Sequence, residues 1–181
     1  MFILDDFGFD GRGAYYLGKD KDFMIEREVR ALINKVRDKI NPEKEIYIGS
    51  SKGGYSALYF GLEIKNSYII IGAPQYNLGD YLSIPNHKSI LEYIMGDSSN
   101  SSIAKLNNLM KDKINLNKNN NLIYIHYSTE EETYKSDIKP LLEELNRLNI
   151  TVYKDQKEYK NHSELTLFFP SYINYVLELI I

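Results

Sequence analysis

Short apolar runs alternate with longer segments of helical pattern, and this alternation limits how the chain can fold more than any other feature. The runs are rich in β-branched and aromatic residues and are bounded by Gly, Pro, Asn or Asp, as buried parallel strands usually are. Strands that alternate with helices favour a mostly parallel sheet covered on both faces. The expected strands are Phe2–Leu4, Glu45–Ile48, Tyr68–Ile71, Leu122–Tyr127 and Ile150–Tyr153.

Apolar residues recur at helical spacing between and after these strands. Residues 73–121 break the alternation with weaker helical patterns and a polar run, and we interpret them as a cap-like insertion over the C-terminal strand ends. The chain has 181 residues, which suits one domain, residues 1–181. A chain that opens in a strand also fits the C-terminal part of a longer protein. The expected helices are Asp22–Ile40, Gly53–Leu62, Ser136–Leu148 and Ser171–Ile180.

Composition excludes several classes of function. A net charge of −3 provides no broad basic surface, so we expect no nucleic-acid partner. The chain has no cysteine, which removes disulfides, thiolate metal sites and a cysteine nucleophile. We expect neither a metal nor a cofactor. No run approaches the roughly 18 apolar residues that span a bilayer, and the start of the chain lacks a signal-peptide pattern. We therefore expect a cytoplasmic protein with no membrane insertion.

The strongest local motif is Gly49-x-Ser51-x-Gly53, placed between a predicted strand and a predicted helix. A serine on such a sharp turn projects its hydroxyl above the sheet, and its neighbours two residues away must be nearly without side chains. The sequence therefore predicts Ser51 as a nucleophile. The competing interpretations are an incidental Gly/Ser turn and a phosphate-binding loop, but the latter requires a lysine after the glycines, and Lys52 precedes Gly53.

A serine hydroxyl needs a base, and in this motif's context the order along the chain is serine, acid, histidine. The chain has 3 histidines. His162 follows the last predicted strand and precedes the last helix, so we predict it as the base. His126 lies inside an apolar run, where a packed structural histidine is expected, and His87 falls in the presumed insertion.

The acid should follow the next-to-last strand, where Glu130, Glu131 and Glu132 stand in a row. One of them would accept a hydrogen bond from His162 and fix its tautomer. By offset from the strand end we favour Glu130, then Glu131. The same carboxylates also suit the start of the following helix. Asp80, after the strand Tyr68–Ile71, is a further alternative.

An oxyanion needs backbone donors. The N–H of Lys52 lies at a helix N-terminus, and the glycine-rich loop after the first predicted strand offers the N–H of Phe7 or Gly8. Arg12 in that loop suits an anionic or polyhydroxyl substrate, and it equally suits an ion pair with a nearby aspartate.

With these motifs the chain resembles the α/β-hydrolase superfamily. A closer resemblance is to a bacterial group of accessory-secretion O-acetyltransferase-like and capsule-polysaccharide biosynthesis proteins. This resemblance implies a minimal fold of the hydrolase type, a Ser-Glu/Asp-His triad and action on acyl groups of glycans. The chain lacks the strands that normally precede its first one. The segments that carry the likeness are Leu4–Gly8, Gly49–Gly54, Ala57–Gly61, Gly72–Gln75 and Tyr159-x-x-His162.

The expected fold class is thus α/β, a three-layer arrangement with a mostly parallel sheet of about five strands flanked by helices. The expected function is acyl hydrolysis of the esterase type through an acyl-enzyme on Ser51, with O-acetyl transfer to a glycan as a close variant. The alternative is a catalytically inactive binding or scaffold module of capsule or secretion machinery. The sequence identifies neither the acyl group, nor the alcohol, nor the oligomeric state.

Overall fold

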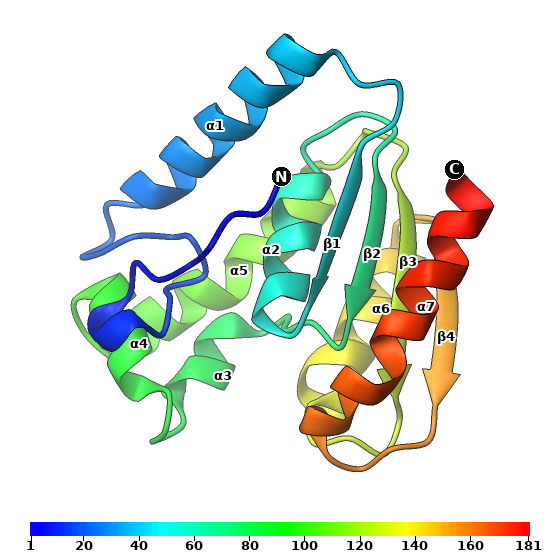
Figure 1. The fold of residues 1–181 in the computed structure, drawn as a ribbon. Helices are drawn as coiled ribbons and strands as arrows, with labels where there is room; N and C mark the ends of the chain where they lie inside the picture. The colour runs from blue at the N-terminus through cyan, green and yellow to red at the C-terminus, as the bar shows by residue number, and fades with distance from the viewer. The chain divides into compact units, whose positions relative to one another are not determined.

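A parallel sheet formed by strands between residues 46 and 157 is the central element of the fold (Figure 1). The structure, a computed structural model, describes residues 1–181 apart from the side chain of Asp10. The sheet has 4 strands in the order β1-β2-β3-β4, and every neighbouring pair is parallel. The predicted α/β class is confirmed, with four strands in place of about five. The strands are β1 (Ile46–Ser50), β2 (Tyr68–Gly72), β3 (Leu122–Ser128) and β4 (Val152–Lys157).

The strand predicted at Phe2–Leu4 is wrong. These residues are not part of any strand that the structure describes, and the side chains of Phe2 and Leu4 are exposed. The backbone oxygen of Ile3 accepts a hydrogen bond from the Tyr16 hydroxyl at 2.5 Å, which is a side-chain contact and not a sheet ladder. An apolar run of this length carries too little periodicity to distinguish a strand from an extended loop.

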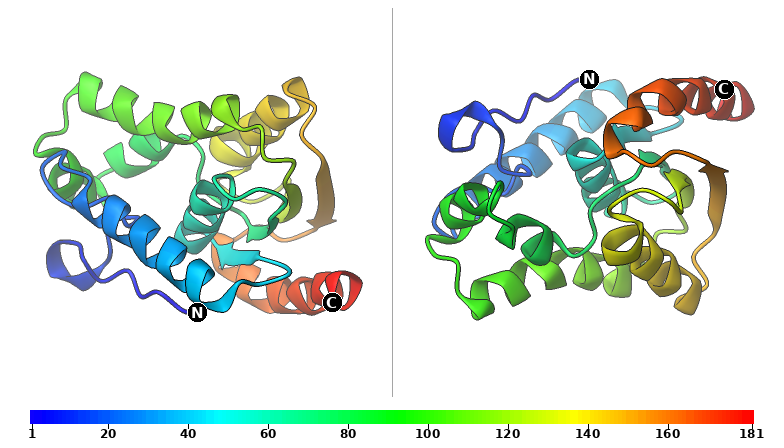
Figure 2. Two further views of the ribbon diagram at one scale, coloured as in Figure 1. Left: turned by 90° about the horizontal axis from the view of Figure 1, so that it is seen from above. Right: turned by 90° about the horizontal axis from the view of Figure 1, so that it is seen from below.

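Helices cover both faces of the sheet. Figure 2 shows α7 (Leu165–Ile180) on one face and α2 (Lys52–Gly61) with α6 (Lys139–Arg147) on the other. Side-chain alternation along the strands agrees with this arrangement. A Cβ at Gly61 of α2 would contact Ile69, whereas a Cβ at Gly72 would contact Phe169 of α7. The helix predicted at Ser171–Ile180 is confirmed as part of α7, which begins earlier, at Leu165, and contains Pro170.

The chain divides into two compact units, residues 1–43 with 77–109 and residues 44–76 with 110–181. The first unit holds α1 (Met24–Ile40), α3 (Leu78–Ser83) and α4 (Lys88–Met95), and α5 (Asn100–Leu116) begins in it. The presumed insertion thus contains α3, which the sequence pattern did not predict. That the chain forms a single domain, with residues 73–121 as a cap over the strand ends, stays a prediction. Among the described residues, no helix combines the length and apolar character needed to cross a membrane.

Candidate active site

Ser51 occupies a strained turn between β1 and α2. Its φ of 51° and ψ of −121° lie where residues other than glycine are rarely found. Two backbone hydrogen bonds fix this geometry. The Ser51 N–H donates to the oxygen of Gly72 at 2.8 Å, and the Ser51 oxygen accepts from the N–H of Tyr55 at 2.9 Å. The sheet and the helix therefore both impose the turn.

The glycines of the motif have unequal roles. A Cβ on Gly49 would lie 2.1 Å from the backbone oxygen of Gly53, a distance that no side chain tolerates. A Cβ on Gly53 would meet no described atom within 4 Å. The requirement for a missing side chain is confirmed at Gly49 and wrong at Gly53. The second tight position is Gly54, whose Cβ would lie 3.2 Å from the oxygens of Gly49 and Gly72.

His162 and Glu131 form a pair after the last two strands. The Nδ1 atom of His162 lies 3.3 Å from Oε2 of Glu131, and the Glu131 side chain is fully buried. The other carboxylate oxygen of Glu131 accepts a hydrogen bond from the Thr133 hydroxyl at 2.7 Å. Glu130, the glutamate favoured by its offset from the strand, is exposed. Of the adjacent glutamates, Glu131 and not Glu130 is the one beside His162, and which of them acts as the acid stays a prediction.

The His162 loop is held by its own cap. His162 opens a short 3-10 turn, His162–Glu164, in which the Glu164 carboxylate accepts the N–H groups of Lys160 at 2.9 Å and Asn161 at 3.0 Å. These bonds lower the pKa of Glu164, the bond from Asn161 first. Because both backbone donors are satisfied, the turn presents the imidazole from a fixed backbone.

The free ring nitrogen of His162 is the atom that can take a proton. Its Nε2 is buried, and it has no hydrogen-bond partner among the described residues. Ser51 Oγ instead accepts a hydrogen bond from Nε2 of Gln75 at 3.3 Å. No hydrogen bond joins Ser51 to His162 in the described part of the chain. Gln75 was not predicted as a site residue, although its position directly after β2 is one where functional side chains gather.

The predicted oxyanion and substrate residues fall in both units. Lys52 is the first residue of α2 and follows Ser51 directly, at the helix end where N–H groups point outward. Phe7, Gly8 and Arg12 belong to the first unit. There Arg12 donates to the oxygen of Asn86 at 3.2 Å and to the hydroxyl of Ser89 at 2.5 Å. The roles of these residues toward an oxyanion or a substrate stay predictions.

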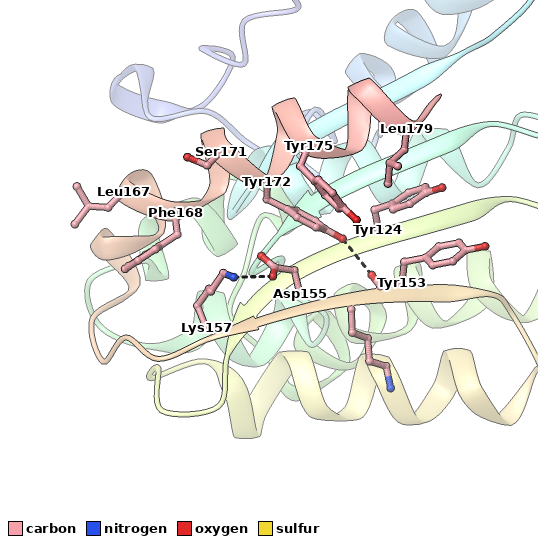
Figure 3. A pocket seen from close by; sticks show the side chains of 11 residues that line it. Tyr124, Tyr153, Asp155, Lys157, Leu167, Phe168, Ser171, Tyr172, Tyr175 and Leu179 are labelled. Carbon is pink, nitrogen blue, oxygen red and sulfur yellow. Dashed lines mark hydrogen bonds and ion pairs between the residues drawn. The ribbon is translucent and has the colours of Figure 1, made fainter. Parts of the chain in front are cut away.

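His126 is a structural histidine in its contacts. It is fully buried on β3, its Nδ1 lies 2.7 Å from Oδ2 of Asp155 on β4, and its ring packs against Tyr159 and Phe169. Asp155 also borders a cavity of about 630 Å³ between β4 and α7. Figure 3 shows Tyr172 and Tyr175 of α7 at this cavity and Asp155 beside Lys157. Neither Ser51 nor His162 lines it, so this cavity is separate from the serine site.

No group of three or more histidine and carboxylate side chains in the described part of the chain is arranged to hold a metal ion. The groups assembled after the strands are instead a serine on a strained turn, an amide that contacts it and a histidine–carboxylate pair. Such groups suit proton transfer and nucleophilic attack.

The fold and the serine turn define a protein of the α/β-hydrolase type, and comparisons with known proteins agree. The capsule O-acetyltransferase of Neisseria meningitidis serogroup A superposes with a TM-score of 0.77 and 25% identity, over 93% of this chain and 69% of that chain. A fluorophosphonate-binding serine hydrolase F of Staphylococcus aureus superposes with a TM-score of 0.66 and 13% identity, over 93% of this chain and 68% of that one. The latter likeness shows the fold alone.

One curated relative completes the comparison. An accessory Sec system protein of Staphylococcus aureus (strain NCTC 8325 / PS 47) is 28% identical over an alignment of 109 residues that covers 52% of this chain and 20% of that protein. The chain thus spans about a fifth of the length of this relative. No protein-family model matches the sequence. The predicted resemblance to α/β hydrolases and to the capsule and accessory-secretion group is confirmed.

Proposed function

We propose that this protein transfers acyl groups from esters through a covalent intermediate on Ser51. The observation that carries the proposal is the strained Ser51 turn, because a φ of 51° in a residue other than glycine persists only when its surroundings impose it. Strain of this kind concentrates at active sites. The pair of half-buried His162 and fully buried Glu131, which leaves Nε2 of His162 without a partner among the described residues, supports the same conclusion.

The residues divide the reaction between them. Ser51 Oγ attacks the ester carbonyl carbon, and His162 Nε2 accepts the Oγ proton and returns it to the leaving alcohol. Glu131 accepts the Nδ1 proton of His162, which orients the ring and stabilises the imidazolium. The N–H of Lys52 binds the negative oxygen of the tetrahedral intermediate.

The substrate we propose is an O-acetyl ester of a glycan, since the capsule O-acetyltransferase shares 25% identity over 93% of this chain. Water or a sugar hydroxyl accepts the acetyl group. The proposal also includes two expectations from the sequence. The protein has no nucleic-acid or membrane partner, and it is cytoplasmic, a location that the absence of cysteine suits.

A second candidate is a non-catalytic scaffold module in capsule or secretion machinery. Two observations favour it. The Ser51 hydroxyl is bonded to Gln75 and not to His162, and the accessory Sec system protein matches over 52% of the chain. Hydrogen bonds of catalytic groups often tighten only when substrate binds, so the first observation is also compatible with an enzyme.

A fluorophosphonate probe separates the two candidates, because it reacts with an activated serine and needs no knowledge of the substrate. We expect wild-type protein to be labelled on the peptide that contains Ser51, as read by mass spectrometry. Ser51→Ala should abolish labelling, whereas Ser50→Ala, a matched change one residue earlier, should retain it. Well-folded wild-type protein that stays unlabelled would overturn the enzymatic proposal in favour of the scaffold.

A further inference from the structure

The loop after β2 places an amide against the nucleophile. Gln75 is fully buried, and its Nε2 donates a hydrogen bond to Ser51 Oγ at 3.3 Å. The polar atoms of a fully buried glutamine form hydrogen bonds with protein groups, because leaving them without partners away from water is costly. One of these partners is the oxygen that the proposed function makes the reacting atom.

The backbone of this loop is held in a strained form. Ala73 has a φ of 38°, a region that a residue with a side chain rarely adopts. Its N–H donates to the oxygen of His126 on β3 at 2.9 Å, so the strain is imposed by the neighbouring strand. An observed outlier of this kind supports a functional role for the segment that contains it.

A buried carboxylate fixes the other end of the loop. Asp137 is almost completely buried, and its Oδ1 accepts the backbone N–H of Tyr76, the residue after Gln75, at 2.7 Å. Its Oδ2 accepts the hydroxyl of Ser136 at 2.6 Å. Asp137 lies in a single π-helical turn, Tyr134–Ile138, and such turns are frequent at functional sites. The loop is therefore clamped on both sides of Gln75.

We propose that Gln75 is a catalytic residue that stabilises negative charge on Ser51 Oγ, an inference that rests on the proposed function. Because Oγ accepts the Gln75 N–H, its own proton is directed to another acceptor, and His162 Nε2 is the buried nitrogen that lacks one. Hydrogen bonds to a charged oxygen are about twice as strong as those to a neutral one. The amide thus favours the charged form of Oγ over the hydroxyl.

This charge develops twice in each turnover. In acylation, Oγ forms a bond to the carbonyl carbon while its proton passes to His162 Nε2, and the bond to the leaving alcohol then breaks as Nε2 returns the proton to it. In deacylation, the acceptor hydroxyl bonds to the same carbon, the bond from carbon to Oγ breaks, and the proton from the acceptor reaches Oγ through Nε2. Gln75 donates to Oγ at its attack and at its departure and is itself unchanged.

The test compares the second-order rate of fluorophosphonate labelling in Gln75→Met, which has similar length but no donor, with wild type. We expect the rate for folded protein to fall about 10- to 100-fold, the value of one hydrogen bond to a charged group. Gln156→Met is the matched control, because Gln156 is exposed. We expect it to label at the wild-type rate.

A second variant covers the case in which Gln75→Met does not fold. Gln75→Leu removes the donor but keeps a side chain of comparable size, so a similar loss is expected. If the wild type is labelled and either folded variant is labelled at the same rate, the role of Gln75 is overturned but the proposed function is not. Absence of labelling in wild type would overturn the proposed function, and the role of Gln75 with it.

Discussion

The Ser128 hydroxyl donates a hydrogen bond to the backbone oxygen of Tyr159 at 2.6 Å. The same hydroxyl oxygen accepts the N–H of Tyr159 at 3.2 Å and that of Glu130 at 3.1 Å. Ser128 is fully buried at the end of β3. One side chain thereby joins the loop that carries Glu131 to the loop that carries His162.

Replacing Ser128 with alanine should loosen this connection. Buried backbone groups of two loops lose a partner, so we expect Ser128→Ala to lower the free energy of unfolding by about 1–3 kcal/mol and to reduce turnover of p-nitrophenyl acetate. Urea denaturation and steady-state kinetics measure the two effects. Ser163→Ala is the matched control, because Ser163 is exposed and should tolerate the change. Equal stability of the two variants would remove Ser128 from this role.

The three adjacent glutamates should differ sharply in their effect on activity. Glu131→Gln removes the charge beside His162 and allows the wrong ring tautomer, so we expect turnover of p-nitrophenyl acetate to fall about 1000-fold or more. Glu130→Gln and Glu132→Gln alter exposed side chains and should retain near wild-type rates. A large loss in Glu130→Gln with none in Glu131→Gln would show that the pairing in the structure is not the one used in catalysis.

The two glycines of the serine motif should respond differently to alanine. Gly49→Ala places a Cβ 2.1 Å from the Gly53 oxygen, so we expect a loss of at least about 3 kcal/mol in unfolding free energy, or no folded protein. Gly53→Ala meets no described atom within 4 Å and lies in α2, where alanine is preferred to glycine by up to about 1 kcal/mol. Thermal unfolding of the pair checks this contrast, and equal destabilisation would contradict it.

Stability should depend on the Glu164 carboxylate at acid pH. Its pKa is lower in the folded protein than in the unfolded chain, because it accepts the N–H groups of Asn161 and Lys160. The carboxylate therefore stabilises the fold above its ordinary pKa of 4.5, and this contribution is lost as the pH falls through the lower, folded value. We expect Glu164→Gln to show a smaller loss of thermal stability than wild type on acidification from pH 6 to about pH 3.

Glu158 provides the control for this titration. Its side chain is exposed, so Glu158→Gln should follow the wild-type dependence on pH. If Glu164→Gln also follows wild type, the cap of the His162 loop does not contribute to acid sensitivity.

The sequence predicted those features of the fold and of the candidate site that depend on patterns of residues close together in the chain. The strands β1 to β3 appeared as apolar runs, and Gly49 and Ser51 appeared as a motif at a strand–helix junction. The run predicted at Ile150–Tyr153 overlaps β4 only at Val152 and Tyr153, because the rest of β4 is polar. His162 followed from its place after the last strand. Choosing among consecutive glutamates was beyond such reasoning, because the loop after β3 buries Glu131 and exposes Glu130 through hydrogen bonds that Ser128 and Thr133 make.

Gln75 and the Phe2–Leu4 run illustrate the remaining gap. Gln75 acts on Ser51, which lies 24 residues earlier, and a pair at this separation leaves no periodic signal in the sequence. Its local indications were its position in the loop after a strand and its place in Gly72–Gln75, one of the segments that carry the resemblance. Phe2–Leu4 has strand-like composition, but whether a run pairs depends on the availability of a neighbouring strand edge.

The order β1-β2-β3-β4 means that each parallel crossover advances by one strand in the same direction. Ser51, Gln75, Glu131 and His162 each follow a different strand, one after another. Each chemical group therefore belongs to its own exchangeable loop, and residues 73–121 extend one of these loops while β2 and β3 remain paired in register. Such a sheet can change its specificity one loop at a time, since lengthening one connection does not require the others to move.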